Sequence, residues 1–266
     1  EAEMQPLYTR EDVADAMAQV RALPYDKCET ILGGVDAAFR DAGHILGSSI
    51  VELWADGRKL VFSGDLGPKG TPILRDPTPI READLVLMES TYGDRNHKER
   101  AETIAELGQI LDDAWRDGGN VLIPAFAVGR SQELLYWFAR HWDEWKLSRW
   151  TIFIDSPMAG KVVEVYGRHH ELFDEDARRV WAERPNPFKL PNLRVTADVE
   201  ESMAINRIER GAIVIAGSGM ASGGRVVLHL ARLLPDSRNS VVLAGYQAAG
   251  TRGRQLLEGA TSVKIH

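Results

Sequence analysis

Apolar runs of strand length alternate with helical patterns through the last two thirds of the chain. The runs "NVLIPAF" from Asn120, "TIFID" from Thr151 and "GAIVIAGSG" from Gly211 are each followed by a turn and a helical pattern. Two further strand-like runs begin at Leu193 and Asn239. Repeated β-turn-α units of this kind are typical of a parallel sheet flanked by helices, so we predict an α/β fold.

The first third of the chain has a different pattern. Thr9–Val20 opens with an N-capping threonine and acidic residues in the first turn, which predicts a short helix. The residues of Glu29–Ser63 favour β-structure, and "ADGR" at Ala55–Arg58 predicts a hairpin turn between two strands. Asp84–Met88 is a further apolar run of strand length. We therefore expect a hairpin-containing part up to about residue 92 and an α/β part after it.

Composition and charge exclude several classes of protein. The 266 residues are 44% hydrophobic and 27% charged, which suits a globular protein with a sizeable core. The net charge of −7 means that a globally basic surface is not what would hold a nucleic acid. A single cysteine, Cys28, excludes an internal disulfide and predicts a reducing, cytoplasmic location. No apolar run approaches the ~20 residues of a membrane span, so we expect no membrane partner.

Two glycine-rich bends each hold one possible metal ligand, His44 and Asp65. Imidazole and carboxylate groups together suit Zn²⁺, and bends at strand ends could aim both at one point. The spacing alone favours ordinary turn chemistry, in which Asp65 caps a turn and His44 packs in the interior. Two ligands are also fewer than the three protein ligands usual in a catalytic zinc site. Glu89, which follows a strand-like run, could serve acid–base chemistry, orient a neighbouring group or merely cap a turn.

Three loops that follow strand-like runs combine glycines, hydroxyl groups and arginines before a helix. Backbone N–H groups at helix starts, hydroxyl groups and guanidinium groups all suit phosphate oxygens. Open α/β sheets bind ligands beyond the carboxyl ends of their strands, so the three loops together predict phosphate recognition. The candidate residues are Arg130 and Ser131 in the first loop, Ser218, Gly219 and Arg225 in the second, and Thr251 and Arg252 in the third.

The remaining histidines and tryptophans favour structural positions. His229 lies in a helical pattern, where a packing or surface role is expected. Trp142 and Trp145 are expected to pack inward at a helix end, and His169 and His170 to lie exposed in a helix tail.

Six stretches carry a resemblance to a known family. They are "DAGHILGSS", "FSGDLG", "ADLVLMESTYGDR", "PAFAVGRSQELL", "AGSGMASGGR" and "VVLAGYQAAGTRGR", and they occur in this order between Asp41 and Arg254. The chain resembles the β-CASP branch of the metallo-β-lactamase-fold nucleases, which includes bacterial RNA-processing ribonucleases and the pre-mRNA 3′-end cleavage factor. The resemblance implies part of a metallo-β-lactamase αββα domain at residues 1–92, a β-CASP parallel-sheet α/β domain at 93–250, and a return to the first domain at 251–266.

The resemblance also implies roles for single residues. His44 corresponds to a zinc ligand, and Asp65 to the aspartate that bridges two zinc ions. Glu89 corresponds to an acidic residue that supports a histidine in the leaving-group step. Two zinc ions in such a site would activate a water for attack on an RNA phosphodiester, while the three loops clamp the RNA backbone.

The sequence departs from the family pattern at both ends. The His-x-His-x-Asp-His cluster, the Ser-Ala-His-x-Asp motif and the late Val-His-Gly motif are absent. We therefore expect a fragment of a zinc-dependent ribonuclease, close to inactive by itself. The alternatives are a non-catalytic RNA-binding module and a DNA-directed β-CASP nuclease. A homodimer stays open, as does the choice between internal and 5′-terminal cleavage.

Overall fold

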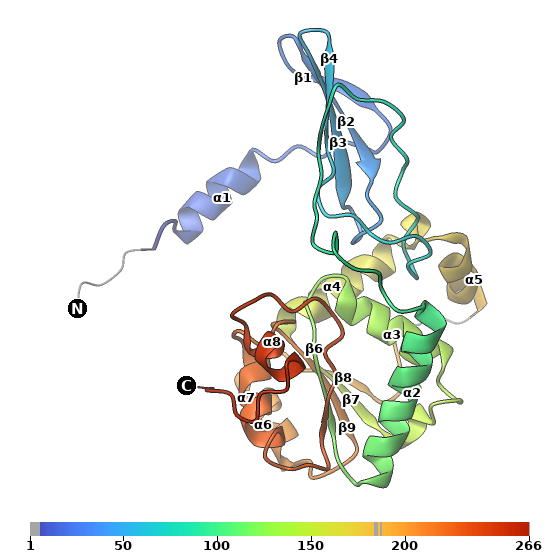
Figure 1. Ribbon diagram of the computed structural model, residues 1–266, viewed down its shortest axis with the longest axis vertical. Helices are drawn as coiled ribbons and strands as arrows, with labels where there is room; N and C mark the ends of the chain where they lie inside the picture. The colour runs from blue at the N-terminus through green and yellow to red at the C-terminus, as the bar shows by residue number, and fades with distance from the viewer. Residues whose placement is uncertain (1–5, 184–185, 187, 266) are drawn as a thin grey trace. The chain divides into compact units, whose positions relative to one another are not determined.

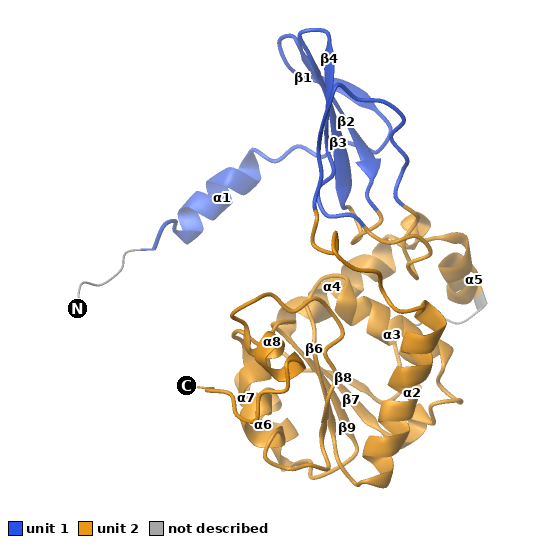
Figure 2. Ribbon diagram, viewed as in Figure 1, with its two compact units in different colours: residues 1–42, 48–66, 77–89 blue, residues 43–47, 67–76, 90–266 orange. Residues whose placement is uncertain are grey.

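The computed structural model describes residues 6–183, 186 and 188–265 (Figure 1). These residues divide into two compact units, which are shown in different colours in Figure 2. Unit 1 comprises residues 1–42, 48–66 and 77–89, and unit 2 comprises residues 43–47, 67–76 and 90–266.

Unit 1 is built on a five-stranded sheet with the order β1-β2-β3-β4-β5. The first four strands are antiparallel neighbours, and β5 pairs with β4 in parallel. The predicted hairpin is confirmed, because Asp56 and Gly57 form its turn with φ angles of 48° and 71°. The elements are α1 (Arg10–Ala18), β1 (Cys28–Leu32), β2 (Val35–Asp41), β3 (Ser49–Ala55), β4 (Arg58–Phe62) and β5 (Leu85–Leu87).

The interior of unit 1 is small. Its buried cluster consists of Ala42, Ile50 and Val61, with Leu66 and Ile80 packed against it. The apolar run that predicted a strand at residues 84–88 does form β5, but all three residues of that strand are exposed.

Unit 2 contains the predicted parallel sheet flanked by helices, so the α/β fold class is confirmed. Its strand order is β10-β6-β9-β7-β8, and every neighbouring pair is parallel. The strands are β6 (Val121–Pro124), β7 (Thr151–Asp155), β8 (Leu193–Val195), β9 (Ala212–Ala216) and β10 (Ser240–Val241). The helices are α2 (Arg100–Arg116), α3 (Arg130–Arg140), α4 (Pro157–Arg168), α5 (Glu175–Glu183), α6 (Val199–Ala204), α7 (Arg225–Leu233) and α8 (Arg252–Leu257).

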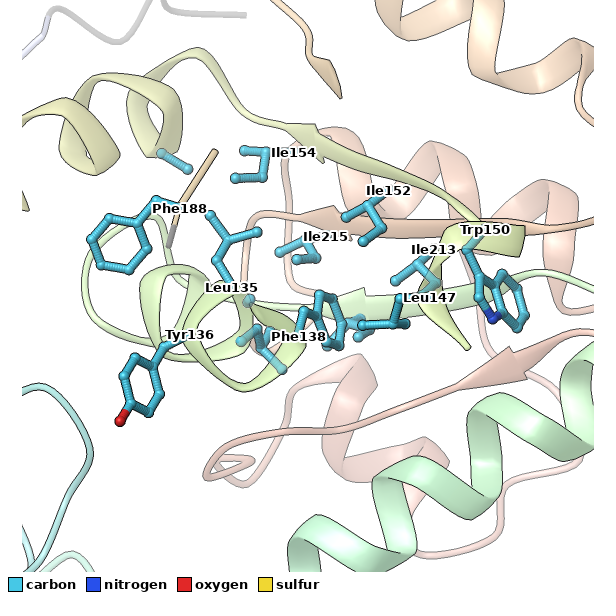
Figure 3. Close-up of a cluster of buried hydrophobic side chains, with 14 of the residues drawn as sticks. Leu135, Tyr136, Phe138, Leu147, Trp150, Ile152, Ile154, Phe188, Ile213 and Ile215 are labelled. Carbon is cyan, nitrogen blue, oxygen red and sulfur yellow. The ribbon is translucent and has the colours of Figure 1, made fainter. Parts of the chain in front are cut away.

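Both faces of the unit 2 sheet are buried, which explains why its strands are apolar without alternation. In β9, Ile213 and Ile215 belong to one hydrophobic cluster, whereas Val214 belongs to the cluster on the opposite face. The first cluster also holds Leu135 and Phe138 of α3, as Figure 3 shows. The second cluster is completed by apolar residues of α7, namely Val226, Val227, Leu230 and Leu233.

The strand order places three loops side by side. Strands β10, β6 and β9 are adjacent and parallel, so their carboxyl ends lie at one edge of the sheet. The loops after them are named here the β6 loop (residues 125–129), the β9 loop (217–224) and the β10 loop (242–251). They contain or directly precede all of the predicted phosphate-binding residues.

Candidate nucleic-acid interface

The β6 and β9 loops are in close contact. The ring of Phe126 lies against the β9 loop, because a Cβ built on Gly219 would be only 2.8 Å from Cδ2 of that ring. The Ala125 N–H donates to the carbonyl of Ala216 at 3.0 Å, which extends the sheet pairing into the loops. Gly219 therefore needs to be glycine, and the two loops form one continuous surface.

Ser131 shapes the β6 loop from inside. Its side chain is buried, and its hydroxyl group donates to the carbonyl of Phe126 at 2.7 Å. Arg130, the preceding residue, is exposed and its guanidinium is paired with Glu133 one turn further along α3. Of these two predicted phosphate-binding residues, Arg130 faces solvent and Ser131 holds the loop backbone.

The side-chain hydroxyl group of Ser218 closes the β9 loop. Ser218 Oγ accepts hydrogen bonds from the N–H groups of Ser222 at 3.1 Å and Gly223 at 3.4 Å. Gly224 has a φ of 77°, and a Cβ there would lie 2.6 Å from the carbonyl oxygen of Gly217. The tight loop therefore depends on glycine at position 224 and on the Ser218 side chain.

The β10 loop and the start of α8 brace the β9 loop. Gln247, which is buried, donates from Nε2 to the carbonyl of Gly219 at 3.1 Å. Arg252 donates from one guanidinium nitrogen to the carbonyls of Ala221 at 3.2 Å and Ser222 at 3.0 Å.

Thr251 caps α8, since its Oγ accepts from the Arg254 N–H at 3.2 Å and donates to the Ala248 carbonyl at 2.7 Å. Thr251 therefore fixes the junction between the β10 loop and α8, whereas Arg252 ties that junction to the β9 loop.

Arg225, at the start of α7, is tied to a buried carboxylate. Asp155, the last residue of β7, has a fully buried side chain that accepts four hydrogen bonds. One carboxylate oxygen accepts from Thr196 at 2.5 Å and from Arg225 at 2.7 Å. The other accepts from Ser202 at 2.7 Å and faces Nε2 of His229 at 2.6 Å.

These contacts decide the charge of Asp155. Burial alone would raise its pKa, but the hydrogen bonds from His229, Thr196, Ser202 and Arg225 outweigh burial and hold the pKa well below its usual value. His229 is buried, so of the two positions expected for it, packing or surface, the structure shows the first. Asp155 was not among the predicted site residues, because its partners follow it by 41 to 74 positions in the sequence.

The segment that carries His44, residues 43–47, belongs to unit 2 and packs on other parts of that unit. The Leu46 N–H donates to the hydroxyl group of Tyr166 at 3.2 Å. A Cβ on Gly129 would lie 2.7 Å from the side chain of Ile45, and a Cβ on Gly67 would lie 1.7 Å from the carbonyl oxygen of Gly43. His44 itself is exposed, in a bend beside the start of α3.

The other two residues with predicted catalytic roles lie in unit 1. Glu89 accepts a hydrogen bond from the Leu66 N–H at 2.8 Å, and its own N–H donates to Ser63 Oγ at 3.0 Å. The Glu89 carboxylate thus holds the turn in which Asp65 lies exposed. His44 belongs to unit 2, so neither unit by itself contains the predicted pair of metal ligands.

The donor set in the described part of the chain does not complete a metal site. Among residues 6–183, 186 and 188–265, no group of three or more His, Cys, Asp or Glu side chains is arranged to hold a metal ion. His44 and Asp65 would supply two ligands, and a catalytic zinc needs about three from the protein.

No helix within the described residues is long and apolar enough to cross a membrane.

Known proteins are similar in sequence to this chain across nearly its whole length. Residues 131–256 match the Beta-Casp domain. Ribonuclease TTHA0252 of Thermus thermophilus is 42% identical, over 98% of this chain and 60% of the relative. An RNase J-like protein of Methanocaldococcus jannaschii is 33% identical, over 97% of this chain and 60% of the relative. Endoribonuclease ysh1 of Schizosaccharomyces pombe is 30% identical, over 94% of this chain and 32% of the relative.

The chain therefore spans three fifths or less of the length of these relatives. The matched domain contains the β9 and β10 loops in full and begins at Ser131, which holds the β6 loop. The resemblance seen in the sequence motifs is confirmed by this match and by the named relatives. Residues 131–256 are a β-CASP domain, and the relatives that the chain resembles over nearly its whole length include proteins named as ribonucleases.

Proposed function

We propose that the chain is the RNA-holding part of a longer protein that hydrolyses RNA phosphodiester bonds, and that the three loops of unit 2 hold the RNA backbone. The observation that carries the proposal is the joining of the loops into one surface through Gly219, which contacts Phe126 and accepts a hydrogen bond from Gln247. The His44 segment packs beside the same surface within unit 2. Two relatives are named as ribonuclease and endoribonuclease, which supports RNA as the substrate class.

The contacts divide the predicted phosphate-binding residues by task. We assign direct phosphate contact to the exposed guanidinium of Arg130 and to the partly exposed side chain of Ser218. Gly219 is buried under the Phe126 ring, so we assign it to the shape of the β9 loop. The other residues predicted for this role maintain the shape of the loops through the hydrogen bonds described above. They are Ser131, Arg225, Thr251 and Arg252.

We propose His44 and Asp65 as two of the ligands of a zinc site, with Glu89 as the residue that positions the Asp65 turn. Because the described residues supply no complete ligand set, we expect the chain by itself to bind RNA without cleaving it. Residues 1–92 would then belong to a metallo-β-lactamase-type domain, and residues 93–250 to the β-CASP domain. The lone cysteine, Cys28, is exposed and free, and it supports a cytoplasmic location.

Fluorescence anisotropy with a labelled single-stranded RNA tests the proposal. The chain should bind the RNA more tightly than DNA of the same sequence and should release no shorter products. Arg130→Ala should weaken binding several-fold. It should also make the negative slope of the logarithm of the association constant against the logarithm of salt concentration shallower by about 0.7, the value for one phosphate contact on a single strand. Arg116→Ala is the control, because Arg116 is also exposed and ion-paired but ends α2 outside the three loops.

Other outcomes would contradict the proposal. Equal losses in the two arginine variants would show that binding does not depend on the β6 loop. Tighter binding of DNA would favour the DNA-directed alternative. Cleavage at the rate of an intact ribonuclease would refute the predicted inactivity of the chain, and the absence of any RNA binding would refute the role of the loops.

A further inference from the structure

An aromatic ring is exposed within the three-loop surface. Phe126 has 49% of its surface accessible, although Ala125 before it is 2% exposed and Ser131 after the turn is 1% exposed. The sequence gives no sign of this, because "NVLIPAF" continues an apolar strand without interruption. The exposed ring is a feature that phosphate recognition does not use.

The position of the ring is fixed by two contacts. The hydroxyl group of Ser131 donates to the Phe126 carbonyl at 2.7 Å and so holds the backbone that carries the ring. The missing side chain at Gly219 lets the ring lie directly on the β9 loop, where a Cβ would be 2.8 Å from Cδ2 and 2.9 Å from Cε2. One edge of the ring is therefore supported by protein, and its orientation is set before any ligand arrives.

The surroundings of the ring are polar. The three loops expose Ser222, Gly224 and Gly245, and the exposed Arg130 directly follows the β6 loop. Tyr246 of the β10 loop is only partly exposed and its ring packs edge-on against Tyr92, so Phe126 is the one exposed large hydrophobic side chain of these loops rather than part of an apolar patch. A protein partner that docks through apolar contacts needs a contiguous patch. A single ring beside phosphate donors is instead the combination with which proteins bind single-stranded nucleic acids, where a base stacks on the ring and basic groups follow the backbone.

We propose that Phe126 stacks on a nucleobase of single-stranded RNA whose backbone is held by the three loops. This inference rests on the proposed function and adds a base contact to it. Every base has a π-face, so the contact should tolerate any base while it requires that the base be unpaired. Phe126 thereby selects single-stranded over double-stranded RNA without reading the sequence.

A thermodynamic cycle between the ring and the base tests the stacking. The full chain is titrated with a labelled single-stranded RNA and with the same RNA in which the bases are removed to leave abasic sites. Phe126→Leu keeps the apolar bulk but removes the ring, and Phe126→Tyr keeps the ring. Met203→Ala, on α6 outside the three loops, serves as the control because Met203 is another exposed apolar side chain. Urea denaturation of each variant verifies that the fold is retained.

Stacking predicts that Phe126→Leu binds intact RNA roughly 5- to 30-fold more weakly than the unchanged chain. Phe126→Tyr and Met203→Ala should bind within about twofold of the unchanged chain. On abasic RNA, the difference between Phe126→Leu and the unchanged chain should fall to about twofold or less, because no base remains to stack.

Two results would overturn the inference and leave the proposed function intact. The first is unchanged affinity of Phe126→Leu for intact RNA. The second is an equal loss on intact and abasic RNA, which would show that the ring acts only through the shape of the loop. Failure of the unchanged chain to bind RNA would overturn the proposed function, and the stacking inference with it.

Discussion

Asp155→Asn should remove a large part of the stability of unit 2. The carboxylate is fully buried, and each of its two oxygens receives two hydrogen-bonding partners. An asparagine amide can replace only one oxygen as an acceptor, and its NH₂ group would face two of the former donors. Two buried groups left without an acceptor cost roughly 1–3 kcal/mol each. Arg225 would lose its counterion in the same change, and breaking a buried pair of this kind costs about 3–5 kcal/mol in all, the unpaired donors included.

The expected loss of about 3–5 kcal/mol is large against the total of roughly 5–15 kcal/mol for a domain. Urea denaturation followed by tryptophan fluorescence measures it, because all of the seven tryptophans except Trp54 lie in unit 2. Asp176→Asn is the matched control, since Asp176 pairs with Arg179 at 3.2 Å and both side chains are more than two-thirds exposed. A loss below about 1 kcal/mol for Asp155→Asn, or one equal to that of the control, would refute the reasoning.

Three further predictions follow from the same contacts. Because the pKa of Asp155 is lowered in the folded chain, the unfolded chain takes up a proton at this carboxylate first on acidification. The stability that the charged Asp155 contributes is therefore present above about pH 4 and lost below it. Urea midpoints should fall less steeply on acidification in Asp155→Asn than in the unchanged chain, and parallel pH profiles would contradict this. Gly219→Ala should lower the thermal midpoint through its clash with Phe126, whereas Gly223→Ala should not, because a Cβ there meets nothing within 4 Å; equal midpoints would refute the close approach. Elemental analysis after dialysis should find close to no zinc per chain, and a value near two would show that the chain supplies a complete ligand set.

Local sequence patterns were sufficient to predict the strands and loops of unit 2. The apolar runs predicted strands, and the glycines after them predicted loops, because chain direction and backbone freedom are encoded within a few residues. The adjacency of β10, β6 and β9 could not be predicted, since strand order depends on pairing between segments that are far apart in the sequence. Strand β10 also has only two residues, Ser240 and Val241, although the apolar run continues beyond them.

The three loops of the candidate site were predicted from the sequence, whereas most contacts between them were not. The residue types of Ser131 and Arg252 suit phosphate, but both side chains hydrogen-bond to backbone carbonyls, Ser131 in the β6 loop just before it and Arg252 in the neighbouring β9 loop. Asp155 and the exposed ring of Phe126 left no local signal, because the first depends on distant partners and the second on the missing side chain of Gly219.

Hydrogen–deuterium exchange of the chain with and without single-stranded RNA tests the central claim most directly. The claim is that the β6, β9 and β10 loops together form the RNA-binding surface. The account predicts slower exchange on RNA binding in peptides covering residues 125–131, 217–225 and 242–252, with little change in peptides of α2 or β1. Protection confined to unit 1, or to one of the three loops alone, would contradict the account.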